Sequence, residues 1–84
     1  MKETSGTLTN TTVAIPADPQ REGLIIANPS DTVMTYRPSG TSTASLGIPV
    51  PAGDSVILQG GALIRNAGTL FCAGTSKAYT IYEW

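Results

Sequence analysis

The side chains that could carry out chemistry are few in this sequence, and they are spread along it. The chain has 84 residues with six carboxylates, five basic side chains, one cysteine and no histidine. Histidine is the commonest general base, and a nucleophilic cysteine works best beside one. A hydrolase built on two carboxylates needs them to face each other across a cleft, and the spacing of the acidic residues indicates no such pair. We therefore expect no enzymatic activity.

The individual reactive residues have ordinary structural interpretations. Asp31 and Asp54 each lie beside the start of an expected strand, where a carboxylate usually accepts hydrogen bonds from turn backbone. Cys72 lies between apolar neighbours and is expected to be buried. A single thiol without histidine cannot make a structural zinc site, and no Asp-x-Asp pattern typical of calcium loops is present. We expect neither a metal nor another cofactor.

The elements that position these residues are expected to be β-strands. Thr, Val, Ile and Tyr are frequent, and Gly or Pro interrupts the chain every few residues. No window of helical length carries apolar residues at helical spacing. The pattern predicts an all-β, compact antiparallel β-sandwich of about eight short strands, jelly-roll-like, with an immunoglobulin-like order as the alternative. The expected strands cover residues 7–15, 23–27, 32–37, 46–50, 55–59, 62–65, 69–73 and 77–84.

Two local patterns predict how the chain is organised. Residues 23–27 (GLIIA) are apolar on both faces, as in a strand that is covered on both sides. The turn at residues 28–31 would bring residues 32–37 back antiparallel against that strand. Near the start, Leu8 is out of phase with the alternation that follows it. We therefore predict an N-terminal arm at 1–8 and a single sandwich domain at 9–84.

The size and charge of the chain favour association with other proteins. A chain this short buries only about 60–65% of its unfolded surface, so it is marginal alone. Only 13% of the residues are charged, and the net charge is −1. Nucleic-acid binders show a basic face, whereas the basic residues here are scattered. The longest apolar run, residues 24–27, is far too short to span a bilayer. We expect protein partners, with no nucleic acid and no membrane.

The end of the chain contains the candidate interface. The last six residues hold three of the five aromatic side chains. Neither face of a strand at residues 77–84 is plainly polar, so one face is expected to pack on the core and the other on a second subunit. The alternative is that these aromatic residues only close the end of one sandwich. The predicted subunit-interface residues are Tyr79, Ile81, Tyr82 and Trp84.

Three stretches together resemble small structural proteins of tailed bacteriophages, the capsid decoration or cement proteins. They are residues 21–37, residues 46–60 and residues 73–84, which end in Glu-Trp. The resemblance implies a structural protein that stabilises a capsid and forms a homotrimer. It also implies that the protein is made in the host cytoplasm and then contacts the major capsid protein at the surface of the virion. It also implies that the N-terminal arm touches the capsid. The residues of that contact would be Lys2, Glu3, Thr4 and Leu8.

A second function is a small carbohydrate- or receptor-binding β-module of a phage fibre or head spike. Such a module stacks sugar rings on exposed aromatic side chains. Tyr36, Tyr79 and Trp84 are the candidates for that platform.

Overall fold

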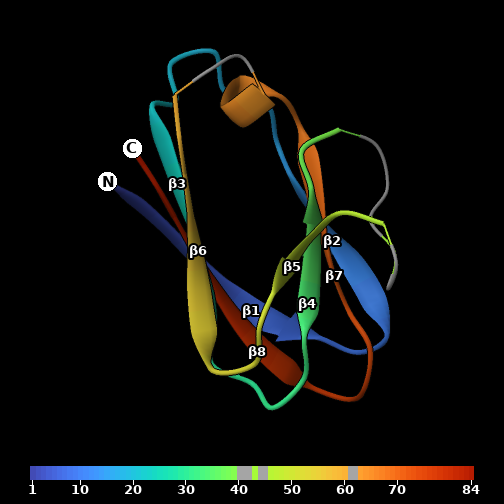
Figure 1. Ribbon diagram of the computed structural model, residues 1–84. Helices are drawn as coiled ribbons and strands as arrows, with labels where there is room; N and C mark the ends of the chain where they lie inside the picture. The colour runs from blue at the N-terminus through green and yellow to red at the C-terminus, as the bar shows by residue number, and fades with distance from the viewer. Residues whose placement is uncertain (40–42, 44–45, 61–62) are drawn as a thin grey trace.

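The protein is a sandwich of two four-stranded antiparallel sheets, seen as two layers in Figure 1. This computed structural model describes residues 1–39, 43, 46–60 and 63–84. The β8 sheet has the order β1-β8-β3-β6, and the β7 sheet has the order β2-β7-β4-β5. The strands are β1 (Lys2–Leu8), β2 (Thr11–Ile15), β3 (Gly23–Asn28), β4 (Met34–Arg37), β5 (Ile48–Val50), β6 (Asp54–Gln59), β7 (Gly68–Cys72) and β8 (Lys77–Glu83).

This order is that of an eight-stranded jelly roll, in which the chain repeatedly crosses between two sheets. The predicted all-β sandwich is therefore confirmed. The core lies between the sheets because alternate residues of each strand point inward. Cys72 is fully buried there, as its apolar neighbours predicted. The buried apolar residues are Leu8, Ile15, Leu24, Ile26, Met34, Tyr36, Val50, Ile64, Leu70, Cys72, Tyr79 and Ile81.

The segment that we expected to be an irregular arm is instead strand β1. It pairs with β8 along its whole length, from Lys2 opposite Glu83 to Leu8 opposite Lys77. Asn10 then takes a left-handed backbone conformation (φ 47°), and the chain crosses into the β7 sheet as β2. The prediction was wrong because the polar residues of β1 look irregular alone, whereas their backbone groups find partners on β8, far away in sequence.

Strand β4 does not pair back on β3, contrary to our expectation. It lies in the opposite sheet between β5 and β7, while β3 lies between β6 and β8. Asn28 holds this crossover, because its side-chain amide donates to the carbonyls of Thr32 (2.8 Å) and Val50 (3.0 Å). A turn-forming sequence shows where the chain reverses, but not whether it returns to the same sheet.

One further expected strand, at residues 62–65, is also corrected. Residues Leu63–Arg65 form a short 3-10 helix, η1, while Ala62 lies outside the described residues. The side chain of Ile64 is buried and joins the core, so η1 covers one open end of the sandwich. The expected loop at 38–45 and the turn at Gly61 also lie partly outside the described residues.

Candidate functional site

Strand β8 lies in the middle of its sheet, between β1 and β3, and this position separates its two faces. Tyr79 and Ile81 point between the sheets and are only 7% and 2% exposed. Both belong to the core of one subunit, so the prediction that they form a subunit interface is corrected. Tyr82 and Trp84 have the opposite parity, lie on the outer face and are half-buried. They are the two predicted interface residues that a partner can reach.

The outer face of the β8 sheet is built from rows of side chains that run across its strands. One row joins Ile57 on β6, Ile25 on β3, Tyr82 on β8 and Glu3 on β1. Ile57 is 61% exposed and adjoins Ile25 and Tyr82, so the exposed apolar surface here is continuous across three strands. Glu3 at the rim is the charged member of this row. The outer face of the β8 sheet consists of this central row and the two rows of side chains on either side of it.

The two rows of side chains beside this central row also contain few charged residues. Small side chains form the row on one side, and Trp84 lies in the row on the other side. Ser5 and Thr80 in the small row share a hydrogen bond of 3.2 Å, which satisfies both hydroxyls. The small row consists of Ser55, Ala27, Thr80 and Ser5, and the other row includes Gln59, Gly23 and Trp84.

Trp84 continues the β8 ladder against β3, and its ring lies over Gly23. Its backbone N–H donates to the Gly23 carbonyl (3.2 Å), and the Gly23 N–H donates back to the Trp84 carbonyl (3.0 Å). A Cβ atom at Gly23 would overlap the six-membered ring of Trp84. The glycine therefore allows the indole to lie close to the sheet. The ring is held as a stiff apolar surface, which suits a protein contact.

A buried ion pair fixes this end of β8 from beneath. Arg21 Nε donates to Glu83 Oε1 (2.9 Å), and Arg21 Nη2 lies 2.7 Å from the same oxygen. The remaining guanidinium donors bind the carbonyls of Ile64 (2.8 Å) and Pro16 (2.6 Å). Because the guanidinium is already bound on all sides, this pair is suited to holding structure rather than binding a substrate.

The sequence analysis missed this pair. The available signal was that Glu83 shares the inward parity of Tyr79 and Ile81, which requires a buried cationic partner. Nothing local in the sequence showed that Arg21, 62 residues away, is that partner.

The four residues expected to touch a capsid lie on different sides of β1. Leu8 is 2% exposed and belongs to the core, so it is not available to a partner. Lys2 is exposed and lies 3.9 Å from Glu83 Oε2 at the inner side of the strand. Glu3 is exposed on the outer face of the β8 sheet, and Thr4 is exposed on the opposite side of β1. Three of the four residues therefore remain accessible.

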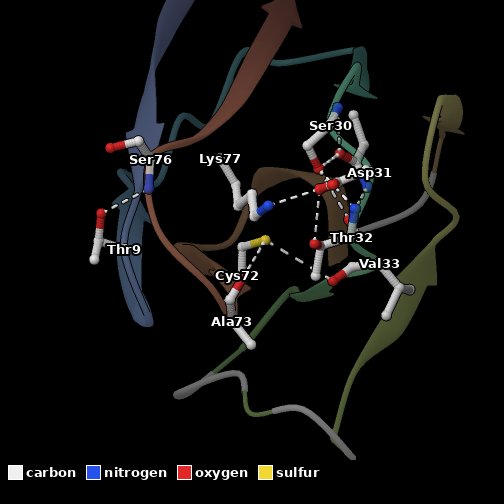
Figure 2. A network of polar contacts seen from close by, with 10 residues as sticks. Thr9, Ser30, Asp31, Thr32, Val33, Cys72, Ala73, Ser76 and Lys77 are labelled. Carbon is white, nitrogen blue, oxygen red and sulfur yellow. Dashed lines mark hydrogen bonds and ion pairs between the residues drawn. The ribbon is translucent and has the colours of Figure 1, made fainter.

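A polar network ties three connections together at one end of the sandwich (Figure 2). Lys77 Nζ lies 2.7 Å from Asp31 Oδ1, which joins the start of β8 to the connection between β3 and β4. The Ser76 N–H donates to Thr9 Oγ1 (2.9 Å), which joins the β7–β8 turn to the β1–β2 connection. The hydrogen bond from Lys77 is the main cause that lowers the pKa of Asp31. Asp31 therefore binds the side chains of Lys77 and Thr32, whereas a turn-backbone donor was expected. Asp54 does accept a backbone hydrogen bond, from the Ser55 N–H (2.8 Å), as predicted.

Cys72 lies beside this network but is enclosed. Its thiol donates to the Ala73 carbonyl (3.3 Å), and burial raises the thiol pKa. A thiol that is buried and held protonated is a poor nucleophile. The geometry agrees with a packing role for Cys72.

An apolar cleft of about 190 Å³ opens between the sheets beside β5 and β6. Its lining includes Ile48, Leu58, Ile64 and Tyr36. Tyr36 is only 1% exposed, and within the described residues its buried hydroxyl has no hydrogen-bond partner. Burial raises the pKa of this phenol. The cleft is a continuation of the core, and of its two polar side chains Tyr36 is covered while Gln59 lies at the exposed rim.

The aromatic platform expected for sugar binding is mostly buried. Tyr36 and Tyr79 lie in the core, and neither offers its ring to solvent. Trp84 is the one member of that predicted set that is partly exposed. Stacking a sugar on Tyr36 or Tyr79 would therefore require the sandwich to open.

Comparison of the sequence with protein-family models, curated proteins and solved structures returned no match. Within the described residues, no group of three or more Asp, Glu, Cys or His side chains is arranged to hold a metal ion. The described part of the chain also contains no helix long and apolar enough to cross a bilayer.

Proposed function

We propose that this protein is a structural, non-catalytic subunit that associates with copies of itself and decorates a bacteriophage capsid. The observation that carries the proposal is the outer face of the β8 sheet. Ile57, Ile25 and Tyr82 form a continuous apolar row there, with Trp84 beside it. The resemblance of the sequence to capsid decoration proteins supports the viral setting and implies a trimer.

The composition of this face fits a protein contact. The buried centres of interfaces are poor in charge and rich in Tyr, Trp and aliphatic groups. The strands that carry Tyr82 and Ile25 are the two central strands of the sheet, so these side chains are already ordered. A partner would lose little conformational freedom in binding them. Tyr82 and Trp84 are already half-buried in the single chain, so covering their remaining surface contributes at most about 4 kcal/mol at about 25 cal/mol per Å².

The proposed mechanism is mechanical. Each copy covers a modest area of the shell and of its neighbours, and many such contacts act together. Both chain ends lie at the same end of the β8 sheet, where Lys2 faces Glu83 (Figure 1). A contact through the exposed residues of β1 would therefore lie next to the apolar face.

The mass of the protein in solution tests self-association. Size-exclusion chromatography with light scattering should show an oligomer of the 8.7 kDa chain at micromolar concentration. Tyr82→Lys places a charge in the centre of the apolar row and should yield a folded protein of lower mass than the wild-type oligomer. Ala14→Lys, on the exposed side of β2 in the other sheet, is the matched control and should remain oligomeric. A wild-type protein that stays monomeric contradicts the proposal.

Imaging tests the viral setting separately. Cryo-electron microscopy of phage particles that carry this chain should place it at regular symmetry positions on the head. Density for the chain on a tail fibre, together with binding to a glycan array, would instead support the sugar-binding module.

A further inference from the structure

Strand β6 is an edge strand without the features that usually protect such edges. The β8 sheet ends at β6, so one side of this strand is unpaired within the described residues. Proteins commonly protect free edges with lysine, proline, bulges or very short strands. The other edge strands follow this rule: β1 carries Lys2, Pro16 follows β2, and β5 has three residues including Pro49. Strand β6 has six residues (DSVILQ), and its one charge lies at the first position.

The hydrogen-bond pattern identifies which backbone groups of β6 face outward. Gly23 exchanges hydrogen bonds with Trp84 on β8, whereas Glu22 accepts one from Gly60 on the β6 side. Because successive residues of a strand direct their backbone groups to opposite sides, Leu24 and Ile26 bond toward β6. Their partners Leu58 and Val56 bond toward β3. The outward-facing backbone groups of β6 therefore belong to Ser55, Ile57 and Gln59.

These outward groups make β6 complementary to itself. An antiparallel pair centred on Ile57 places Ile57 opposite Ile57 of the second copy and Ser55 opposite its Gln59. Each residue pair then exchanges N–H···O bonds, and all the outward groups of the strand find partners. Asp54 falls opposite Gly60, so no like charges meet. In the single chain the Ser55 N–H donates to the Asp54 carboxylate (2.8 Å). In the pair it would donate to the second copy instead.

We infer that two copies of this chain join edge to edge through β6, making one continuous eight-stranded sheet about a twofold axis at Ile57. This inference rests on the proposed self-association and adds an edge contact to the contact through the outer face of the β8 sheet. The pair also joins the two apolar rows, because Ile57 ends the row that continues through Ile25 and Tyr82. A twofold contact predicts an even-numbered assembly, whereas the resemblance implies a trimer.

Cysteine cross-linking tests both the contact and its register. Residues in a hydrogen-bonded antiparallel pair have Cα atoms about 5.5 Å apart, within the range that a disulfide spans. Ile57→Cys should form a covalent dimer as its main species under mild oxidation. Val33→Cys is the matched control, since Val33 is also an exposed aliphatic residue (52%) but lies away from β6. Wild-type protein controls for Cys72, which is buried.

Mixing two further variants determines the register. Ser55→Cys and Gln59→Cys should each remain uncross-linked alone and should cross-link when mixed, because the inferred pair places these positions opposite each other. Cross-linking of Ser55→Cys with itself would overturn the register. Without any mutation, the Ile57 and Gln59 amides should exchange hydrogen more slowly as protein concentration rises.

The outcomes separate this inference from the proposed function. If the wild type is oligomeric, Tyr82→Lys is monomeric and Ile57→Cys cross-links no better than Val33→Cys, the edge pairing is wrong and the face contact stands. If Ile57→Cys cross-links and Tyr82→Lys keeps the wild-type mass, the edge pairing stands and the face contact is wrong. A monomeric wild type with no cross-linking overturns both.

Discussion

Arg21 Nη2 lies 2.7 Å from Glu83 Oε1 in the interior of the sandwich, and the two side chains join segments from opposite ends of the chain. Arg21 is 2% exposed and Glu83 is 7% exposed. The same guanidinium reaches the carbonyls of Ile64 and Pro16. One side chain thus connects the last strand to η1 and to the segment after β2. A small protein without a disulfide depends on such links.

Removing Arg21 is expected to be strongly destabilising. Arg21→Met leaves the buried Glu83 carboxylate without its partner, which costs about 3–5 kcal/mol. This is a large share of the stability of a small domain, so urea unfolding should shift to much lower concentration. Lys2→Met is the control, because Lys2 is an exposed partner of the same carboxylate and contributes at most about 1 kcal/mol. Equal, small losses in both variants would show that the buried pair contributes little.

The ion pair also changes how the C-terminal interface can be tested. Deleting Tyr82–Trp84 would remove Glu83 and part of a central strand, so the truncated chain should unfold rather than become a folded monomer. Circular dichroism of the truncated chain should show loss of β-structure, while Tyr82→Lys keeps it.

Replacing Tyr36 by phenylalanine is expected to stabilise the protein. Among the residues that the structure describes, the buried Tyr36 hydroxyl has no hydrogen-bond partner, and such a group costs about 1–3 kcal/mol. Tyr36→Phe should therefore unfold at higher urea concentration at pH 7. Tyr82→Phe, at a half-buried position on the outer face, should change stability little. A destabilised Tyr36→Phe variant would indicate that the hydroxyl is bound in solution.

The same substitution predicts a difference at alkaline pH. Burial raises the folded-state pKa of Tyr36 above its ordinary value of 10.0. The neutral phenol is therefore favoured in the folded state, and its contribution to the free energy of unfolding is fully present below pH 10. It is lost as pH rises through the folded pKa, because the unfolded chain ionises first. The stability advantage of Tyr36→Phe should thus increase above pH 10, as unfolding curves at pH 7 and above pH 10 would show.

Adding a methyl group at Gly23 should displace the Trp84 ring. The new Cβ would overlap the indole, and overpacking of this kind typically costs about 1–3 kcal/mol. Since Trp84 is the single tryptophan, its fluorescence reports the change directly. Gly23→Ala should shift the emission to longer wavelength and lower the urea midpoint. Thr7→Ala, an exposed substitution in the same sheet, should leave the emission unchanged.

The ion pair between Asp31 and Lys77 is expected to weaken at acidic pH. The hydrogen bond from Lys77 lowers the pKa of Asp31 from its usual 3.8, so the contribution of this pair is present above that value. It is lost as pH falls through the folded pKa. An NMR titration should place the Asp31 pKa below 3.8 in the wild type and nearer to it in Lys77→Gln. An unchanged pKa in the variant would assign the shift to the Thr32 hydroxyl, which donates to the same carboxylate oxygen (3.1 Å).

Local residue patterns were enough to predict the class of structure and several local environments. Thr, Val and Ile between frequent Gly and Pro predicted short strands, and the burial of Cys72 followed from its apolar neighbours. The alternation along residues 77–84 correctly divided the strand into the face of Tyr79 and Ile81 and the face of Tyr82 and Trp84. All these features depend on the two-residue period of a strand, which any single segment displays.

Local patterns did not predict which strands pair with each other, because that pairing depends on the folded chain as a whole. The two-residue alternation of side chains is the same whichever sheet a strand joins. It therefore could not show that β4 lies in the other sheet from β3, or that β1 pairs with β8. The same holds for Arg21 and Glu83, whose contact joins positions 62 residues apart. Within the described residues β6 pairs with β3 alone, and its own sequence does not show that its other side is left free. Strand pairing depends on contacts between residues that are far apart in sequence. The pattern within one short segment shows which side chains share a face, but it does not identify the strand that will lie beside it.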